Sequence, residues 1–465
     1  MKLNSVTRAW DVPLSSGIVL FVALALAPLF GLALAWESWI ILGATVMVAL
    51  VPIGVRWPVV STFGLYVLVV PLDSVKLLAD AGGTTLSKPL GVLAAAVLAG
   101  AGLMERRFGR PPMAALFWGL FMVWATLSAM WTINPEKTFG RLPTALSLFF
   151  LYVIAVSIRP SRKEFRWVCL LVVVGGAIAA ALAYLYGLEG ATEASVRGRL
   201  VIGDRASNPN KLGTALIVPL ALAMAGVVGL HSPPQRAMAL GFLGLIGGGM
   251  FISMSRSAIV AIIATISVLL YRLRVRWQIL AAVVVLLALA ATMPDAFFAR
   301  MSRVFTGDDD TGSGRTEIWK VGLKALEEFG LFGAGLSNFQ EAYSIYVVPE
   351  GLSGHGVTAH NVYLLVWVEL GFVGLALMLA ALGCHLLAVH RARKEGRGGV
   401  ALAAVEAGCV GVLVLTLFLD DIWRKEFWLA WILLTWATHL AGQSDDNTRL
   451  SSLTATQVSP RQAGS

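Results

Sequence analysis

The chain consists mainly of long apolar runs separated by short polar connections. Many runs are about 20 residues long, the length at which a helix rising about 1.5 Å per residue crosses a hydrocarbon layer of ~30 Å. They do not alternate between apolar and polar residues as a membrane-spanning strand does, and lipid requires a spanning segment to satisfy its own backbone hydrogen bonds. The pattern therefore predicts an all-α, polytopic helical membrane protein with about 12–14 transmembrane helices.

The ends of the apolar runs set the boundaries of the predicted spans. Because the first run is long and further spans follow it, we expect an uncleaved span rather than a signal peptide. Segment 294–359 is the one large extramembrane piece, and the polar tail 443–465 is predicted to be disordered. The predicted spans lie near 16–36, 38–55, 58–72, 86–103, 113–132, 142–158, 167–187, 212–230, 237–253, 257–271, 277–293, 360–382, 400–419 and 426–441.

Basic residues gather in the short connections on one side of the predicted bundle, and the positive-inside rule makes that side cytoplasmic. Both termini are then cytoplasmic, and segment 294–359 lies on the opposite, extracytoplasmic side. With 57% hydrophobic and 14% charged residues, the composition is that of a membrane protein and indicates no nucleic-acid partner. The basic connections are 105–110, 159–166, 272–276 and 390–397.

The sequence predicts no metal site. In "GDDDTGSG", Asp308 and Asp310 have the alternate spacing of a calcium loop, but Gly312, Ser313 and Trp319 stand where that loop needs other residues. We therefore expect a solvated turn there. The cysteines show neither a CxxC spacing nor an even pairing, so they predict no disulfide framework; they are Cys169, Cys384 and Cys409.

Three polar residues stand in the otherwise apolar stretch "TAHNVYLLVWVELGFVG". His360 is expected in the first turn of a helix, where the positive end of the helix dipole favours a neutral imidazole able to accept a proton; the alternative is a hydrogen-bonded anchor at the membrane interface. Asn361 is expected either to cap the helix or to hold a ligand hydroxyl. Glu369 lies ~13 Å further along the helix, so we expect it to give buried structural support.

Further polar residues open predicted helices on the extracytoplasmic side. Arg256 and Arg315 stand beside helix starts, and Arg199 and Arg205 share one loop with Asn210, which is expected to cap the following span. Arginines in such positions either snorkel to the lipid headgroups or bind an anion. An outward basic surface at the membrane indicates a ligand such as a lipid phosphate or pyrophosphate.

The extracytoplasmic stretch "GRTEIWKVGLKALEEFG" (314–330) has helical periodicity, because Ile318, Gly322, Leu326 and Phe329 share one face. It predicts a helix at the membrane interface or over the bundle, and a lid over a site is compatible with that placement.

The stretch "HNVYLLVWVELGFVG" resembles the HN…E.G signature of the bacterial O-antigen ligase and O-antigen polymerase superfamily. The resemblance continues in "GRTEIWKVGLKALEEFGLFGAGLSNF", "SRSAIVA", "NPNKLG" and "DDIWRKEFWLAWIL". It divides the chain into N-terminal transmembrane helices (1–199), an O-antigen ligase-like membrane domain (200–442) and the tail (443–465).

The resemblance implies an inverting glycosyltransferase of the bacterial inner membrane, with its active site facing the periplasm and without a metal or other cofactor. The donor would be a glycan on undecaprenyl pyrophosphate, and the acceptor of a ligase would be lipid A core. The family's essential histidine carries over to His360 and its important arginines to Arg256 and Arg315. Arg199 or Arg205 would assist them in holding the pyrophosphate.

Three other interpretations stay open at this point. A repeat-unit or exopolysaccharide polymerase of the same superfamily would transfer the glycan to another lipid-linked glycan, and a protein O-glycosyltransferase is also compatible. A transporter or flippase for lipid-linked glycans would need broken helices and charges deep in several spans, whereas Glu369 is the main deep charge here.

Overall fold

The computed structural model describes residues 57–74, 87–189, 201–202, 205–206, 209–230, 232–253, 255–274, 277–291, 315–347 and 357–457. In these residues eight helices are long and apolar enough to cross a membrane, and three shorter apolar helices lie beside them. The predicted all-α, polytopic architecture is confirmed. The predicted spans 16–36 and 38–55, and the acidic run at Asp308, lie outside the described residues.

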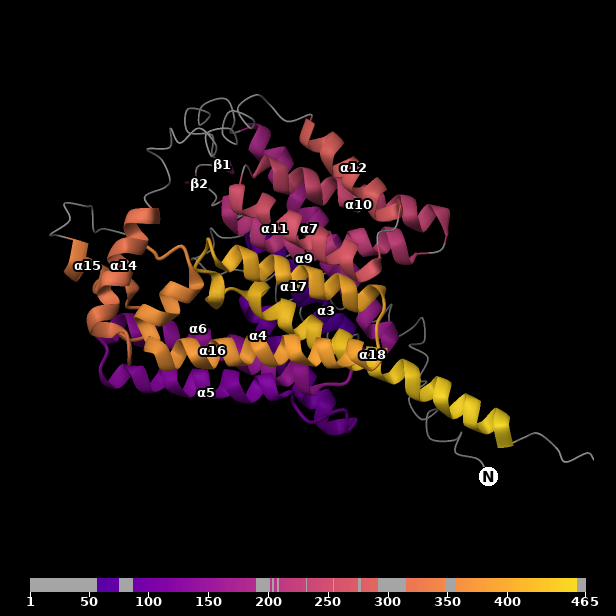
Figure 1. The fold of residues 1–465 in the computed structure, drawn as a ribbon, viewed down its shortest axis with the longest axis horizontal. Coiled ribbons are helices and arrows are strands. Elements are labelled where there is room, and N and C mark those ends of the chain that lie inside the picture. Colours follow the sequence, from indigo (N-terminus) through magenta and orange to yellow (C-terminus); the bar gives the residue numbers. More distant parts are fainter. Residues whose placement is uncertain are drawn as a thin grey trace, which may run out of the picture.

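Most of the helices run side by side along the long axis of the molecule (Figure 1). The helical elements are η1 (Val59–Phe63), α3 (Gly64–Val69), η2 (Val70–Ser74), α4 (Ser87–Met104), α5 (Met113–Leu127), η3 (Ser128–Met130), α6 (Pro135–Ser157), α7 (Arg162–Glu189), α9 (Pro209–Gly229), α10 (Pro233–Ile252), α11 (Arg256–Leu273), α12 (Trp277–Ala291), α14 (Arg315–Phe329), α15 (Phe339–Val347), α16 (Val362–Lys394), α17 (Val400–Thr416), η6 (Asp421–Trp423) and α18 (Lys425–Gln457).

The two ends of the bundle differ. Helices α14 and α15 lie at the end where α16 begins, while α18 extends beyond the opposite end (Figure 1). We call the first the outer end and the second the inner end. Near the outer end, β1 (Val201–Ile202) pairs antiparallel with β2 (Arg205–Ala206), which adds a short hairpin to the helical fold.

Helix α9 lies at the centre of the bundle, in contact with α7, α10, α11 and α17. Small residues allow these helices to approach each other closely, as is common between membrane helices. A Cβ atom added at Gly249 of α10 would lie 2.6 Å from the Cβ of Ala180, and one added at Gly411 of α17 would lie 2.6 Å from Cγ1 of Ile217.

The predicted span 360–382 is not one continuous helix. Helix α16 is broken at Gly371, where φ is 68° and ψ is −173°. Loop 330–338 docks against the break and takes up backbone groups that the helix leaves unpaired. Ala334 N donates to Val368 O at 2.9 Å, and Phe372 N donates to Gly330 O at 2.8 Å. The break is therefore satisfied by hydrogen bonds, as a membrane-embedded helix requires.

Two tryptophans complete this junction. Trp124 Nε1 donates to Leu370 O at 2.7 Å, and Trp367 Nε1 donates to Gly330 O at 3.0 Å. The chains approach so closely that a Cβ at Gly371 would overlap Leu331 O, and one at Gly333 would overlap Glu369 O. Glycine is thus required here both for its positive φ and for the space it leaves.

Other predicted boundaries shift for local reasons. The predicted span 58–72 consists of the short elements η1, α3 and η2 rather than one regular helix. Helix α6 begins at Pro135 instead of residue 142, because Asn134 caps it by accepting a hydrogen bond from Lys137 N at 3.3 Å. The helix predicted over 314–330 is confirmed as α14, with Ile318 and Gly322 on its buried face.

The end of the chain differs from the prediction of a disordered tail from residue 443. Helix α18 continues to Gln457, so residues 443–457 are helical, and 458–465 lie outside the described residues. No glycine or proline occurs between Gly442 and Gln457 to end the helix.

At the inner end, a buried carboxylate joins three helices. Glu406 of α17 accepts hydrogen bonds at 2.6 Å from Arg272 of α11 and from Arg393 of α16. Because each carboxylate oxygen has its own guanidinium partner, Glu406 is compensated within the bundle.

The substitution Gly371→Ala is expected to lower the free energy of unfolding by about 3 kcal/mol or more, since it adds both a strained φ and an overlap with Leu331 O. The measurement is thermal unfolding of the purified protein in detergent. Gly383→Ala in the same helix is the matched control, because a Cβ there meets no atom within 4 Å. Equal melting temperatures for the two variants would contradict the proposed role of the break.

Candidate functional site

His360 lies at the outer end, two residues before the first helical residue of α16, and its backbone is left-handed with φ 47°. This differs from the predicted place in the first helical turn, because Asn361 is the N-cap. The Asn361 side-chain oxygen accepts a hydrogen bond from Leu364 N at 3.0 Å. Of the two alternatives for that residue, the structure shows the cap.

The imidazole of His360 is half-buried, and burial is the main cause that lowers its pKa below the ordinary value. The carboxylate of Asp420 acts in the opposite direction and raises the pKa, while the positive charge of Arg315 lowers it. Since the pKa is lowered, the neutral imidazole is favoured at pH 7, with burial as the largest cause. Thr358 Oγ1 lies 3.4 Å from Nε2 of the ring.

Arg315 and Arg256 form a cationic pair beside this histidine. Burial lowers the pKa of Arg315, and the charge of Arg256 lowers it further. Within the described part of the chain, the buried Nε of Arg315 has no hydrogen-bond partner. Two arginines held near each other create a local positive potential that favours an anionic ligand. The structure thus places Arg315 within electrostatic reach of both His360 and Arg256.

Asn210 has a different position from the predicted one. Helix α9 begins at Pro209, so Asn210 lies inside its first turn rather than at its cap. Its side-chain oxygen accepts a hydrogen bond at 2.7 Å from Ser255, the N-cap of α11. Asn210 therefore helps to hold the start of α11, which is also the position of Arg256.

The predicted contributions of Arg199 and Arg205 remain predictions. Arg199 lies outside the described residues, and only the backbone of Arg205 is described, in β2.

Glu369 supports the loop that precedes α15. It is only 5% exposed, and its two carboxylate oxygens accept hydrogen bonds from Ser337 N at 2.9 Å and from Phe339 N at 3.3 Å. These contacts agree with buried structural support. They also explain why a carboxylate is tolerated next to the helix break: it pairs with backbone N–H groups of the loop.

A polar cavity of about 540 Å³ lies beside the histidine at the outer end. Thr358, two residues before His360, lines it, as do Asp420 and Arg424. Arg424 pairs with Glu426 at 2.5 Å, yet its buried Nη1 has no hydrogen-bond partner among the described residues. The remaining charged lining residues are Lys137, Arg141, Lys211, Glu369 and Asp421.

Several of these groups were missed from the sequence. Asp420 directly follows the predicted span 400–419, and the acidic pair Asp420 and Asp421 at the end of that span was the available signal. Lys137 and Arg141 lie four residues apart in α6, which places them on one face, although the N-terminal helices carry no recognisable motif. Arg141 reaches loop 330–338, with Nε 3.5 Å from Ser337 Oγ.

Contacts with α9 and with N-terminal helical elements hold the loop between α17 and α18 in place. Asp421 accepts a hydrogen bond from Thr214 of α9 at 2.8 Å, and burial raises the pKa of Asp421 to about 6. Lys425 forms an ion pair with Asp73 at 2.5 Å and also contacts Ser87. These contacts fix the loop that carries Asp420.

The chemistry of this site follows from its residues. A neutral imidazole can accept a proton from a hydroxyl group, guanidinium groups can bind phosphate oxygens, and the adjoining cavity presents polar groups of both charges. Among the described residues, no group of three or more metal-ligating side chains is found.

A search of curated proteins gives no match to this chain. A protein-family model described as O-antigen ligase matches residues 240–379, a stretch that contains Arg256, Arg315 and His360. This match supports the membership of the chain in the O-antigen ligase superfamily, whose members are membrane enzymes of the ligase and polymerase type.

Proposed function

We propose that this protein transfers a glycan from undecaprenyl pyrophosphate to an acceptor hydroxyl at the outer end of the bundle, as an O-antigen ligase with lipid A core as the acceptor. The observation that carries the proposal is the position of His360. Its neutral imidazole lies beside Asp420 and next to the cationic pair Arg256 and Arg315, in the stretch that matches the O-antigen ligase family.

In the proposed mechanism, Arg256 and Arg315 bind the pyrophosphate and stabilise the negative charge that develops on it. His360 takes the proton from the acceptor hydroxyl while that oxygen attacks the anomeric carbon. The bond from this carbon to the phosphate oxygen breaks, undecaprenyl pyrophosphate leaves, and the configuration is inverted. Asp420 stabilises the imidazolium that forms, because an opposite charge favours the protonated ring.

The proposed topology follows the charge pattern of the connections. The outer end would face the periplasm of a bacterial inner membrane, and both termini would be cytoplasmic. The described residues of the basic connections, 105–110, 159–166, 272–274 and 390–397, lie at the inner end.

A repeat-unit or exopolysaccharide polymerase is the second candidate, because the family match covers both activities. The two differ in the acceptor. Loss of a ligase leaves full-length glycan on its lipid carrier, whereas loss of a polymerase leaves single repeat units. The glycan profile of a deletion strain therefore distinguishes them. A non-catalytic transporter has less support: α16 is broken at Gly371, but loop 330–338 closes the break with hydrogen bonds, and the carboxylate of Glu369 is engaged by Ser337 N and Phe339 N.

His360→Ala is expected to reduce glycan transfer by about 10²-fold or more, because the proton acceptor is lost. Transfer is measured with the purified protein in liposomes, using a lipid-linked glycan donor and lipid A core. His390→Ala, an exposed histidine at the inner end of the same helix, is the matched control and should leave transfer unchanged. Full activity of His360→Ala would exclude this mechanism.

The pH dependence of transfer should reflect the lowered pKa of His360. The imidazole acts in its neutral form, so activity is retained as the pH falls to the ordinary histidine pKa of 6.5 and is lost only below it. Asp420→Asn removes the charge that raises this pKa and should move the acid limb to a still lower pH. Glu327→Gln, an exposed acid in α14, is the control. An acid limb above pH 6.5 would contradict the assignment.

Arg315→Gln is expected to lower kcat/KM by about ten- to a hundred-fold, the effect of one lost charge-assisted contact. The double variant with Arg256→Gln should lose less than the product of the two single effects, since both groups hold one pyrophosphate. Lys320→Gln on the exposed face of α14 is the control. If the loss of kcat/KM in the double variant equalled the product of the two single losses, this would argue against a ligand shared by Arg256 and Arg315.

A further inference from the structure

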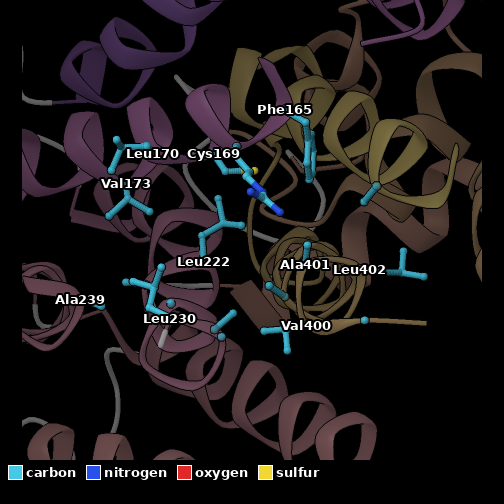
Figure 2. Close-up of a pocket in the computed structure, with 18 of the residues that line it drawn as sticks. Phe165, Cys169, Leu170, Val173, Leu222, Leu230, Ala239, Val400, Ala401 and Leu402 are labelled. Carbon is cyan, nitrogen blue, oxygen red and sulfur yellow. The ribbon is translucent and has the colours of Figure 1, made fainter. Parts of the chain in front are cut away.

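A second cavity, of about 620 Å³, lies between α7, α9, α10, α17 and α18 (Figure 2). Its wall is formed by the first turns of α7, α10 and α17 and the last turns of α9, together with residues near Ala441 of α18. Helix α16 runs from Val362, two residues after His360 at the outer end, to Lys394, and α17 begins soon afterwards at Val400. The cavity therefore lies at the inner end, away from the site around His360.

The body of this cavity is apolar and is lined largely by small residues. Figure 2 shows Phe165, Cys169 and Val173 of α7 and Leu222 of α9 around it. Glycines and alanines leave the space open, since they carry at most one methyl group. They include Gly226 and Gly229 near the end of α9, Gly399 and Ala401 at the start of α17, and Ala441 of α18.

The charge of the lining has one sign. Arg162 and Arg166 are its charged residues, both exposed, and no acidic residue contributes to the wall. Arg162 reaches across to α18, where its Nη2 donates to Leu440 O at 3.3 Å. One edge of an apolar cavity is thus cationic.

The backbone adds to this positive potential. Helices α7, α10 and α17 all begin at the cavity, and the N-terminus of a helix carries a partial positive charge. Gly399, the N-cap residue of α17, offers no side chain to cap the helix. Together with Arg162 and Arg166, these helix starts favour a negatively charged group at the edge of the cavity.

We propose that this cavity binds an anionic phospholipid of the surrounding bilayer. Its phosphate would lie at Arg162 and Arg166, and an acyl chain would fill the space between α7, α9 and α17. An apolar body with a cationic edge is complementary to such an amphiphile, whereas a free phosphate would leave the apolar wall in contact with water. Basic pockets between membrane helices on the cytoplasmic side are suited to anionic headgroups.

The bound lipid would fill the space among the inner ends of α7, α9, α10, α17 and α18. This site goes beyond the proposed transferase function and does not depend on it, because none of its lining residues belongs to the site around His360.

The experiment uses the full chain in nanodiscs that contain equal amounts of palmitoyl-oleoyl phosphatidylglycerol and phosphatidylcholine. The lipid retained after release from the disc is counted by native mass spectrometry. Wild type and His360→Ala should both retain one phosphatidylglycerol per chain, in preference to phosphatidylcholine. Arg162→Gln/Arg166→Gln should retain about ten-fold less. Lys163→Gln, an exposed cation in the same helix but not in the lining, is the matched control.

A second variant tests the apolar part. Ala401→Trp places a large ring into the cavity from an exposed position at its rim, so it should displace the lipid without altering the core. Equal retention of the two lipids by wild type, or unchanged retention in both the double arginine variant and Ala401→Trp, would overturn the proposal. If a variant does not fold, the preference of wild type for phosphatidylglycerol and its loss at high salt decide the question.

Discussion

The docking of loop 330–338 against the break in α16 is the interaction on which the outer end of the structure depends. A helix inside a membrane cannot leave backbone groups unpaired, and this chain satisfies the rule by pairing a loop with the broken segment. Glu369 extends the same junction, since its carboxylate holds Ser337 and Phe339. The loop in turn contacts Arg141 of α6, so one backbone junction determines where α15 and part of the polar cavity lie.

The charged and titratable groups at the outer end act on the pKa of His360 in opposite directions, and their burial strengthens these effects. Arg256 and Arg315 repel each other, and both burial and the charge of Arg315 oppose protonation of His360. Asp420 is the one described group that acts against this tendency. A buried guanidinium such as that of Arg315, whose Nε has no hydrogen-bond partner among the described residues, favours a nearby anion, which is the arrangement expected where negative charge develops during a reaction.

Much of the helical framework could be predicted because hydrocarbon thickness and apolar length determine it. Helices α4, α9 and α11 begin and end within a few residues of the predicted spans. The break at Gly371 could not be predicted, because it depends on loop 330–338. That loop is distant in sequence, and its residues do not indicate that it pairs with a helix. His360, Arg256 and Arg315 were singled out as polar residues at predicted helix starts and then matched by the resemblance, whereas Asp420 and the cations of α6 become part of the site only through tertiary packing.

The ion pair between Lys425 and Asp73 has a consequence for how this protein can be divided. Asp73 belongs to the N-terminal helices, which carry no recognisable motif, while Lys425 follows the loop that holds Asp420. Lys137 of α6 likewise pairs with Glu341 of α15. The second pair reaches the stretch that matches the family, residues 240–379, because Glu341 lies within it, so this stretch does not pack as an isolated unit. Replacing the N-terminal helices by those of another protein would remove Asp73 and Lys137, and with them the ion-pair partners of Lys425 and Glu341 at the outer end.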